Sequence, residues 1–287
     1  MPERSFDSVR LPGLWFWLSS AAALLAAAGA VVGLLATDGI YGKETAALAD
    51  AAAAQDIVDL VIVAPVLGLL AWCAQRGCLQ AYISWLGCLA FFVYNFAIFA
   101  FSVHFGPLFL VWVAVLGMSI FSLAGGLSAL DTGAVKAHFS HRPMTLPGWF
   151  LMVVATAFAL LWLSEIVPDL IAGDPSSSGS DWKIPTNPVH VLDLAFFLPA
   201  TFVSGLLLLR RHPLGYATAV GQLVWLALTC LPILLTPFVA DARGHEPGWA
   251  VMIPIGIMLF ASLAVLVQLL RRSSPDQSGG DESESPR

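Results

Sequence analysis

The sequence predicts an all-α membrane protein with eight transmembrane helices, arranged as two parallel four-helix repeats with both termini in the cytoplasm. Three observations support this prediction. Hydrophobic residues make up 58% of the chain and charged residues 11%, whereas a typical soluble domain is about one-quarter charged. Apolar runs of the ~20 residues that a bilayer core requires recur along the whole length. Finally, a set of residues in the first half recurs in the second half at constant spacing.

Eight apolar segments are expected to cross the membrane, and a polar segment divides them into two sets of four. The expected helices are 11–36, 56–75, 80–103, 106–129, 146–167, 188–210, 213–238 and 248–271. The chain therefore divides into a first module, 1–129, a cytoplasmic linker, 130–145, and a second module, 146–272. The acidic tail, 273–287, has the Ser, Gly, Asp and Glu composition of a disordered segment. The Ala-rich run 45–55 is expected to extend the second helix outward.

One set of residues appears twice, with no gap and an offset of 134 positions. The two copies are Asp59, Leu60, Pro65, Arg76 and Tyr82, and Asp193, Leu194, Pro199, Arg210 and Tyr216. Each module has an even number of helices, so both copies enter the membrane in the same direction. We therefore expect parallel repeats related by a pseudo-two-fold axis along the membrane normal, with a working site where the copies meet.

The distribution of Lys and Arg predicts the orientation in the plasma membrane, because cytoplasmic loops are enriched in these residues. With the N-terminus inside, ten of them are cytoplasmic: Arg4, Arg10, Arg76, Lys136, Arg142, Arg210, Arg211, Arg271, Arg272 and Arg287. The three external ones are Lys43, Lys183 and Arg243. The predicted partner is the lipid bilayer, and a net charge of −6 does not indicate a nucleic-acid-binding protein.

Several enzyme classes lack support in the sequence. The four cysteines do not form a C-x-x-C pair, which argues against a thiol–disulfide enzyme. Nucleotide-binding loops, nucleophile elbows, zincin helices and haem-attachment motifs do not occur in the sequence. We therefore expect no cofactor, and an enzymatic activity has the least support among the possible functions.

Asp59 and Asp193 are the strongest candidates for a functional site, because a carboxylate in a bilayer core costs about 2.5–3.5 kcal/mol and is rarely idle. Each has a possible partner three residues earlier on the same helix face, namely Asp56 and His190. Glu165 is expected at the same height. We predict that these five residues form a cation-, proton- or ligand-binding site near the outer face. Three carboxylates and one imidazole could also bind a divalent metal ion.

An alternative explanation is that the two aspartates only mark the membrane boundary. Each lies 17 residues before an arginine, Arg76 or Arg210, and 17 residues of helix span about 25 Å, close to the thickness of the hydrocarbon layer. Asp59 and Asp193 would then face headgroups at helix N-termini. Glu165 could face headgroups in the same way.

Prolines and interior polar residues are the remaining features of the two modules. Pro65 and Pro199 each follow an aspartate by six residues and are expected to break both helices at one depth, because a proline leaves a backbone carbonyl without its donor. Other polar groups inside the helices, such as Asn95, are expected to hydrogen-bond between helices. Gly29 and Gly33 form a G-x-x-x-G pattern that could allow close helix packing.

The segment Asn187-Pro188-Val189-His190-Val191-Leu192-Asp193, followed by Pro199, resembles a stretch of uncharacterised multi-pass membrane proteins of actinobacteria. The resemblance implies no activity. Three functions remain open: a small permease or channel-like or ligand-binding protein, a structural, sensory or assembly protein that transports nothing, and, with least support, an intramembrane enzyme.

Overall fold

The computed structural model describes residues 10–139 and 144–271 and consists of helices joined by short connections. Eight of the helices in these ranges are long and apolar enough to cross a membrane, which confirms the predicted number. Their bounds are Gly13–Leu35, Ala46–Gln75, Leu79–Ser102, Phe109–Ala129, Thr145–Ala172, Pro188–Leu209, Pro213–Ala242 and Trp249–Leu270. The acidic tail and the predicted cytoplasmic residues Arg4, Arg142, Arg272 and Arg287 lie outside the described residues.

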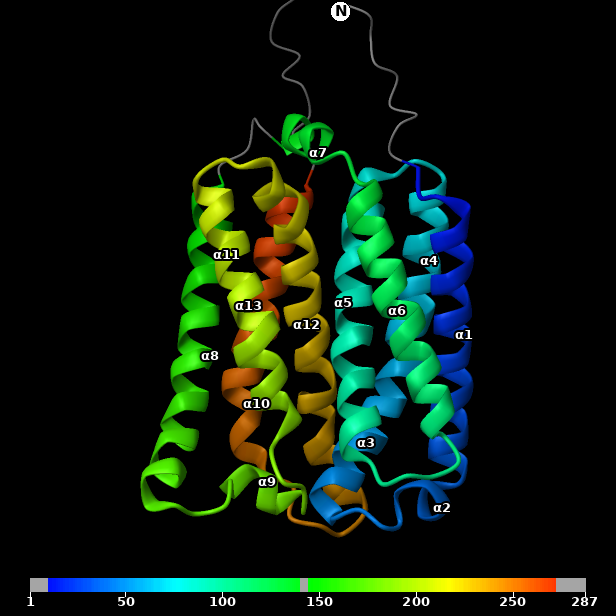
Figure 1. Ribbon diagram of the computed structural model, residues 1–287, viewed down its shortest axis with the longest axis vertical. Helices are drawn as coiled ribbons and strands as arrows, with labels where there is room; N and C mark the ends of the chain where they lie inside the picture. The colour runs from blue at the N-terminus through cyan, green and yellow to red at the C-terminus, as the bar shows by residue number, and fades with distance from the viewer. Residues whose placement is uncertain (1–9, 140–143, 272–287) are drawn as a thin grey trace, which may run out of the picture.

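The first four spanning helices stand beside the last four (Figure 1). The first group contains α1 (Gly13–Leu35), α3 (Ala46–Val58) with its continuation α4 (Ala64–Gln75), α5 (Leu79–Ser102) and α6 (Phe109–Ala129). The second contains α8 (Thr145–Ala172), α10 (Pro188–Leu192) with α11 (Leu198–Leu209), α12 (Pro213–Ala242) and α13 (Met252–Leu270). α5 packs along α12 and so joins the two groups.

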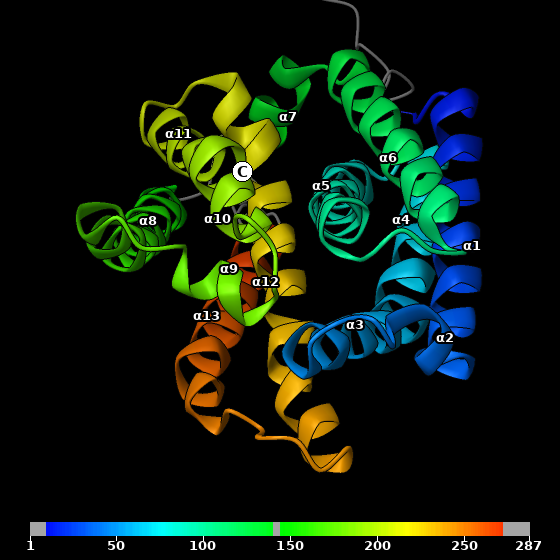
Figure 2. The ribbon, with the colours of Figure 1, turned by 60° about the horizontal axis from the view of Figure 1, so that its bottom comes forward.

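Short helices lie at both ends of the bundle (Figure 1). At one end α7 (Thr132–Phe139) belongs to the connection between the two groups, and α1 begins at this same end. At the opposite end lie α2 (Thr37–Tyr41) and α9 (Ser177–Asp181). Viewed from that opposite end, α3 reaches across to α12 (Figure 2), and the two helices are in extensive contact.

Three helices extend beyond their predicted bounds for local reasons. The second span begins at Ala46 because the Thr45 side chain caps it, accepting a hydrogen bond from the Leu48 amide at 3.3 Å; this confirms the predicted outward extension. The fifth span includes Pro168 and ends only at Gly173, whose positive φ of 73° terminates the helix. The seventh span continues past its predicted end to Ala242.

Burial is concentrated around α5, whereas the peripheral helices present apolar surface outward. Trp85, Cys88 and Phe92 of α5 are completely buried. By contrast, Ile253 and Phe260 of α13 are largely exposed. Exposed apolar side chains around a bundle of this length are what a lipid environment requires, since lipid tails solvate them. The central pair α5 and α12 therefore provides the protected environment in which polar groups can be held.

Small residues set the closest helix contacts. The backbones of α5 and α12 meet at Gly87 and Gly221: a Cβ at Gly87 would lie only 2.7 Å from the Gly221 Cα. The predicted G-x-x-x-G residues also pack closely, but against two different helices. A Cβ at Gly29 would lie 3.3 Å from Val111 of α6, whereas one at Gly33 would overlap with Asp56 of α3.

Candidate functional site

Both candidate aspartates begin a five-residue π-helical segment within an otherwise α-helical span. These segments are η2 (Asp59–Val63) and η3 (Asp193–Phe197), and in each the aspartate carbonyl accepts a hydrogen bond from an amide five residues later. Pro65 and Pro199 follow within the next turn. The expected irregularity at matched positions is therefore present, as a wide turn. Such π-segments occur frequently at functional sites.

The carboxylate of Asp59 is buried and held by two amide groups. Gln55 Nε2 donates to Oδ1 at 2.9 Å, and Asn95 Nδ2 of α5 donates to Oδ2 at 2.7 Å. Asp59 is 1% exposed, and no ion pair of the described residues involves it. Each side-chain oxygen of Asp59 therefore accepts a hydrogen bond from a neutral donor. Among the described residues, no cationic side chain lies within ion-pair distance of Asp59.

Asp56 lies one turn before Asp59 and interacts with a different element. The Tyr41 hydroxyl, at the end of α2, donates to Asp56 Oδ2 at 2.7 Å, and both residues are buried. Burial and, next, the neighbouring Asp56 carboxylate raise the pKa of Tyr41 well above its usual range. The absence of a side chain at Gly33 leaves the space for this pair.

The carboxylate of Asp193 has aromatic donors in place of amides. Trp162 Nε1 of α8 donates to Oδ2 at 2.8 Å, and Oδ1 is buried without a hydrogen bond of standard geometry. The Tyr94 phenol of α5 lies close enough to interact electrostatically with this carboxylate. The polar contact of Trp162 with Asp193 had no signal in the sequence.

His190 and Glu165 form a separate contact at the edge of the Asp193 environment. His190 Nε2 lies 3.5 Å from Glu165 Oε2, and the His190 ring lies 4.6 Å from the Trp162 ring. The His190 side chain is buried, whereas that of Glu165 is 41% exposed. Trp162 therefore contacts both His190 and Asp193, and these residues together with Glu165 make one local group.

The five predicted site residues therefore form two groups. Asp56 and Asp59 belong to one, and His190, Asp193 and Glu165 to the other, because α5 stands between the two aspartate-bearing spans. No three His, Cys, Asp or Glu side chains within 10–139 and 144–271 are placed to hold a metal ion, so the four-ligand metal cluster considered from the sequence does not form among these residues. The boundary-marker alternative is also wrong in one respect, since both Asp59 and Asp193 are buried within the bundle and do not face headgroups.

Two consecutive residues of α5 reach both groups. Asn95 donates to Asp59 and Tyr94 faces Asp193, as expected for neighbouring positions that point about 100° apart around a helix. Asn95 was predicted to bond between helices, and its hydrogen bond to η2 confirms this. The two carboxylates are thus connected to a common helix although they do not contact each other.

A cavity of about 180 Å³ lies next to this part of α5. Its walls come from α3, α5, α10 and α12, with Trp182 from the connection after α9. Gln55, Tyr94 and Asn95 line it, so the side chains around the two aspartates also form the cavity wall. Most of the remaining lining is apolar.

The lining residues include pairs that are separated by the repeat offset of 134 positions. The pairs are Leu48 and Trp182, Gln55 and Val189, Asn95 and Thr229, Ile98 and Pro232, and Phe99 and Ile233. Gly87 and Gly221, which contact each other, have the same separation. The cavity and this glycine contact therefore both involve residues that are 134 positions apart in the sequence.

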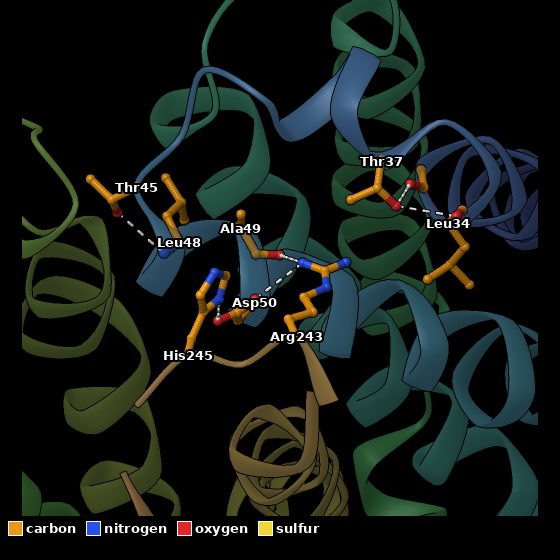
Figure 3. Close-up of polar contacts among 9 residues, drawn as sticks. Leu34, Thr37, Thr45, Leu48, Ala49, Asp50, Arg243 and His245 are labelled. Atoms are coloured by element: carbon orange, nitrogen blue, oxygen red, sulfur yellow. Dashed lines mark hydrogen bonds and ion pairs between the residues drawn. The ribbon is translucent and has the colours of Figure 1, made fainter. Parts of the chain in front are cut away.

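A charged clamp joins the two halves at the end of the bundle that carries α2 and α9 (Figure 3). Asp50 of α3 accepts from Arg243 Nη1 at 3.1 Å through Oδ1, and its Oδ2 lies 2.7 Å from His245 Nδ1. Arg243 also donates to the Ala49 carbonyl at 3.2 Å. Asp50 is 2% exposed. The 134-residue repeat pattern does not include this clamp, because the position 134 residues after Asp50 is Ile184.

Comparison with protein-family models, curated proteins and solved structures gives no match to this chain. The site is therefore interpreted from its own geometry.

Proposed function

We propose that this protein is a small permease or ligand-binding membrane protein whose site is the cavity between its two four-helix halves. The supporting observation is the dual role of α5: Asn95 and Tyr94 line the cavity and also reach Asp59 and Asp193. Ligand binding in the cavity would therefore affect both carboxylates through these two side chains. In this proposal the aspartates exchange a proton or attract a cation, while Glu165 and His190 support Asp193 and Asp56 supports the first group.

The proposal includes an internal repeat with parallel modules and a pseudo-two-fold axis between α5 and α12. Three observations support it: the matched π-segments, the paired lining positions and the Gly87–Gly221 contact. A two-fold axis between two equivalent helices brings equivalent residues face to face. Gly87 and Gly221 are such a pair, since they contact each other across α5 and α12. Binding sites at repeat interfaces are common in duplicated transporters.

We also propose that the α7 end of the bundle is cytoplasmic and that the membrane is the plasma membrane. Arg76 and Arg210 end α4 and α11 at the α7 end, where Lys136 also lies, whereas Lys43 and Lys183 belong to the opposite end. This agrees with the enrichment of Lys and Arg on the cytoplasmic side. The cavity then lies in the extracytoplasmic half of the bundle.

A second candidate, a sensory or assembly protein that binds a ligand without moving it, is favoured by the contacts that hold the halves together. The Asp50 clamp joins them at one end, and Gly87 meets Gly221 deeper in the bundle. Transport by alternating access would require the clamp to open, because the two halves must move relative to each other.

Uptake into proteoliposomes tests the first proposal. The solutes are benzenesulfonate and benzyltrimethylammonium, which carry permanent opposite charges and cross lipid slowly, with mass spectrometry as the readout. We expect one of them to accumulate above protein-free liposomes, and Asp59→Asn or Asp193→Asn to reduce its initial uptake at least tenfold. Asp38→Asn, the same change at an exposed residue, is the control and should leave uptake unchanged. Binding without uptake would favour the sensory alternative, and the absence of both would contradict the proposed site.

A further inference from the structure

The chemistry of the cavity wall indicates which ligands it accepts. The side-chain NH₂ groups of Gln55 and Asn95 face Asp59, because each donates a hydrogen bond to one of its two side-chain oxygens. The amide oxygens of these two residues then point away from Asp59, and neither accepts a hydrogen bond within the described residues. Gln55 is 9% exposed and Asn95 4% exposed, and both line the cavity. Two unpartnered amide oxygens therefore face the cavity.

The threonines of the opposite wall strengthen this pattern. Thr229 and Thr236 of α12 use their hydroxyl protons within the helix, donating to the Trp225 and Pro232 carbonyls at 2.9 and 2.8 Å. Only hydroxyl lone pairs then remain for a ligand. Among the polar lining groups, the exceptions are the indole N–H of Trp182 and the hydroxyl of Tyr94, which lies near Asp193. The wall thus presents acceptors almost exclusively.

Charge and aromatic rings in the cavity wall also favour a cationic ligand. The hydrogen bonds to Asp59 polarise the two amides that donate them, so their oxygens carry more negative charge into the cavity. None of the described lining residues is Lys, Arg or His. Phe91, Tyr94 and Phe99 add aromatic rings to the wall, and aromatic faces attract cations. These acceptors would repel an anionic group on a ligand.

The size of the cavity limits the rest of the ligand. An apolar cavity of about 150 Å³ holds one benzene ring, and this one has about 180 Å³ with a mostly apolar lining. We infer that the cavity selects small ligands that carry an ammonium group on an apolar body of about one ring. This inference rests on the proposal that the cavity is a ligand site, and it adds the class of ligand.

Alkylation protection with three ligands of the same size tests the inference. Thr229→Cys places a thiol in the cavity wall, and the exposed native Cys78 is an internal reference. Purified protein is treated with N-ethylmaleimide and increasing benzylammonium, benzyl alcohol or benzoate, and labelling of each thiol is quantified by peptide mass spectrometry. We expect benzylammonium to protect the introduced thiol at a concentration at least tenfold below benzyl alcohol, benzoate to be weakest, and Cys78 to be unaffected.

The same measurement in the Asp59→Asn background identifies the source of the selectivity. We expect the advantage of benzylammonium over benzyl alcohol to fall at least tenfold, while benzyl alcohol itself changes less than twofold. If this variant does not fold, the order in which the three ligands protect the Thr229→Cys thiol in the otherwise wild-type protein still tests the ammonium inference. Equal or better protection by benzyl alcohol or benzoate overturns the ammonium inference but leaves the proposed cavity site intact. Protection by none of the three overturns both.

Discussion

Gly87 and Gly221 meet backbone to backbone where α5 packs against α12, with no room for a side chain at Gly87. The two residues are separated by the same 134 positions as Asp59 and Asp193. Part of the cavity wall is formed by residues that follow each glycine on the same two helices, such as Asn95 and Thr229. The glycine contact therefore sets the spacing of the helices at one end of the cavity.

Adding a methyl group at this contact should destabilise the protein. In Gly87→Ala the new Cβ would lie 2.7 Å from the Gly221 Cα and 2.8 Å from the Val224 Cβ, and overpacking typically costs about 1–3 kcal/mol. We expect a lower melting temperature in detergent, measured with a thiol-reactive dye that reports exposure of the buried Cys88 and Cys230. Gly117→Ala on α6, where nothing lies within 4 Å, is the control. An equal effect of both changes would contradict a specific contact.

The hydrogen bond from Asn95 to Asp59 should contribute measurably to stability. Asn95→Leu removes one of the two donors to a buried carboxylate, which costs about 1–3 kcal/mol. A double-mutant cycle with Asp59→Leu separates this interaction from the loss of packing, and we expect a coupling free energy of about 0.5–3 kcal/mol. Unfolding by sodium dodecyl sulfate in mixed micelles provides the free energies. Additive effects would show that the two side chains do not interact.

Alkaline pH should weaken the contribution of the Tyr41 hydroxyl. Burial and the Asp56 carboxylate raise the pKa of Tyr41 in the folded protein above its usual value of 10.0, so the folded state keeps the proton that the unfolded state loses. The stability advantage over Tyr41→Phe is therefore constant below about pH 10 and decreases by up to about 1.4 kcal/mol per pH unit above it. Unfolding of both proteins between pH 8 and 11 measures this difference. A constant difference across the range would contradict the buried pair.

The Asp50 clamp should stabilise the contact between the two halves. Asp50 is buried but the Arg243 side chain is 28% exposed, so removal of the carboxylate in Asp50→Asn should cost about 1–3 kcal/mol, between the values of exposed and buried ion pairs. Combining Asp50→Arg with Arg243→Asp reverses both charges and should recover part of this stability. The melting temperature is the readout, and Asp38→Asn at an exposed position is the control. No recovery in the double variant, together with no loss in Asp50→Asn, would exclude a stabilising clamp.

The spanning helices and the irregular turns could be predicted because they depend on local sequence. Apolar length determines the number of helices, Thr45 caps the outward extension, and Pro65 and Pro199 cannot donate in a regular α-helix. The proline pair predicted where the irregularity falls. Only the structure shows that the turn is π-helical and that it begins at the aspartates.

The contacts of the site could not be predicted because they depend on which helices are neighbours. Periodicity and charge spacing place Asp59 and Asp193 at one depth, but they do not show that α5 lies between them. Tyr41, Asp50 and Arg243 form their contacts with residues that are distant in sequence or outside the repeat. The sequence also allowed Glu165 to face headgroups, and its 3.5 Å approach to His190 likewise depends on how α8 packs near α10.

The central claim is that Asp59 and Asp193 both serve the cavity lined by Gln55, Tyr94 and Asn95. The most direct test is the affinity of purified protein for whichever of benzylammonium, benzyl alcohol and benzoate binds most tightly, measured by equilibrium dialysis in wild type, Asp59→Asn and Asp193→Asn. A shared site predicts weaker binding in both variants, because Asn95 and Tyr94 connect the two carboxylates to the same wall. Unchanged affinity in either correctly folded variant would contradict it.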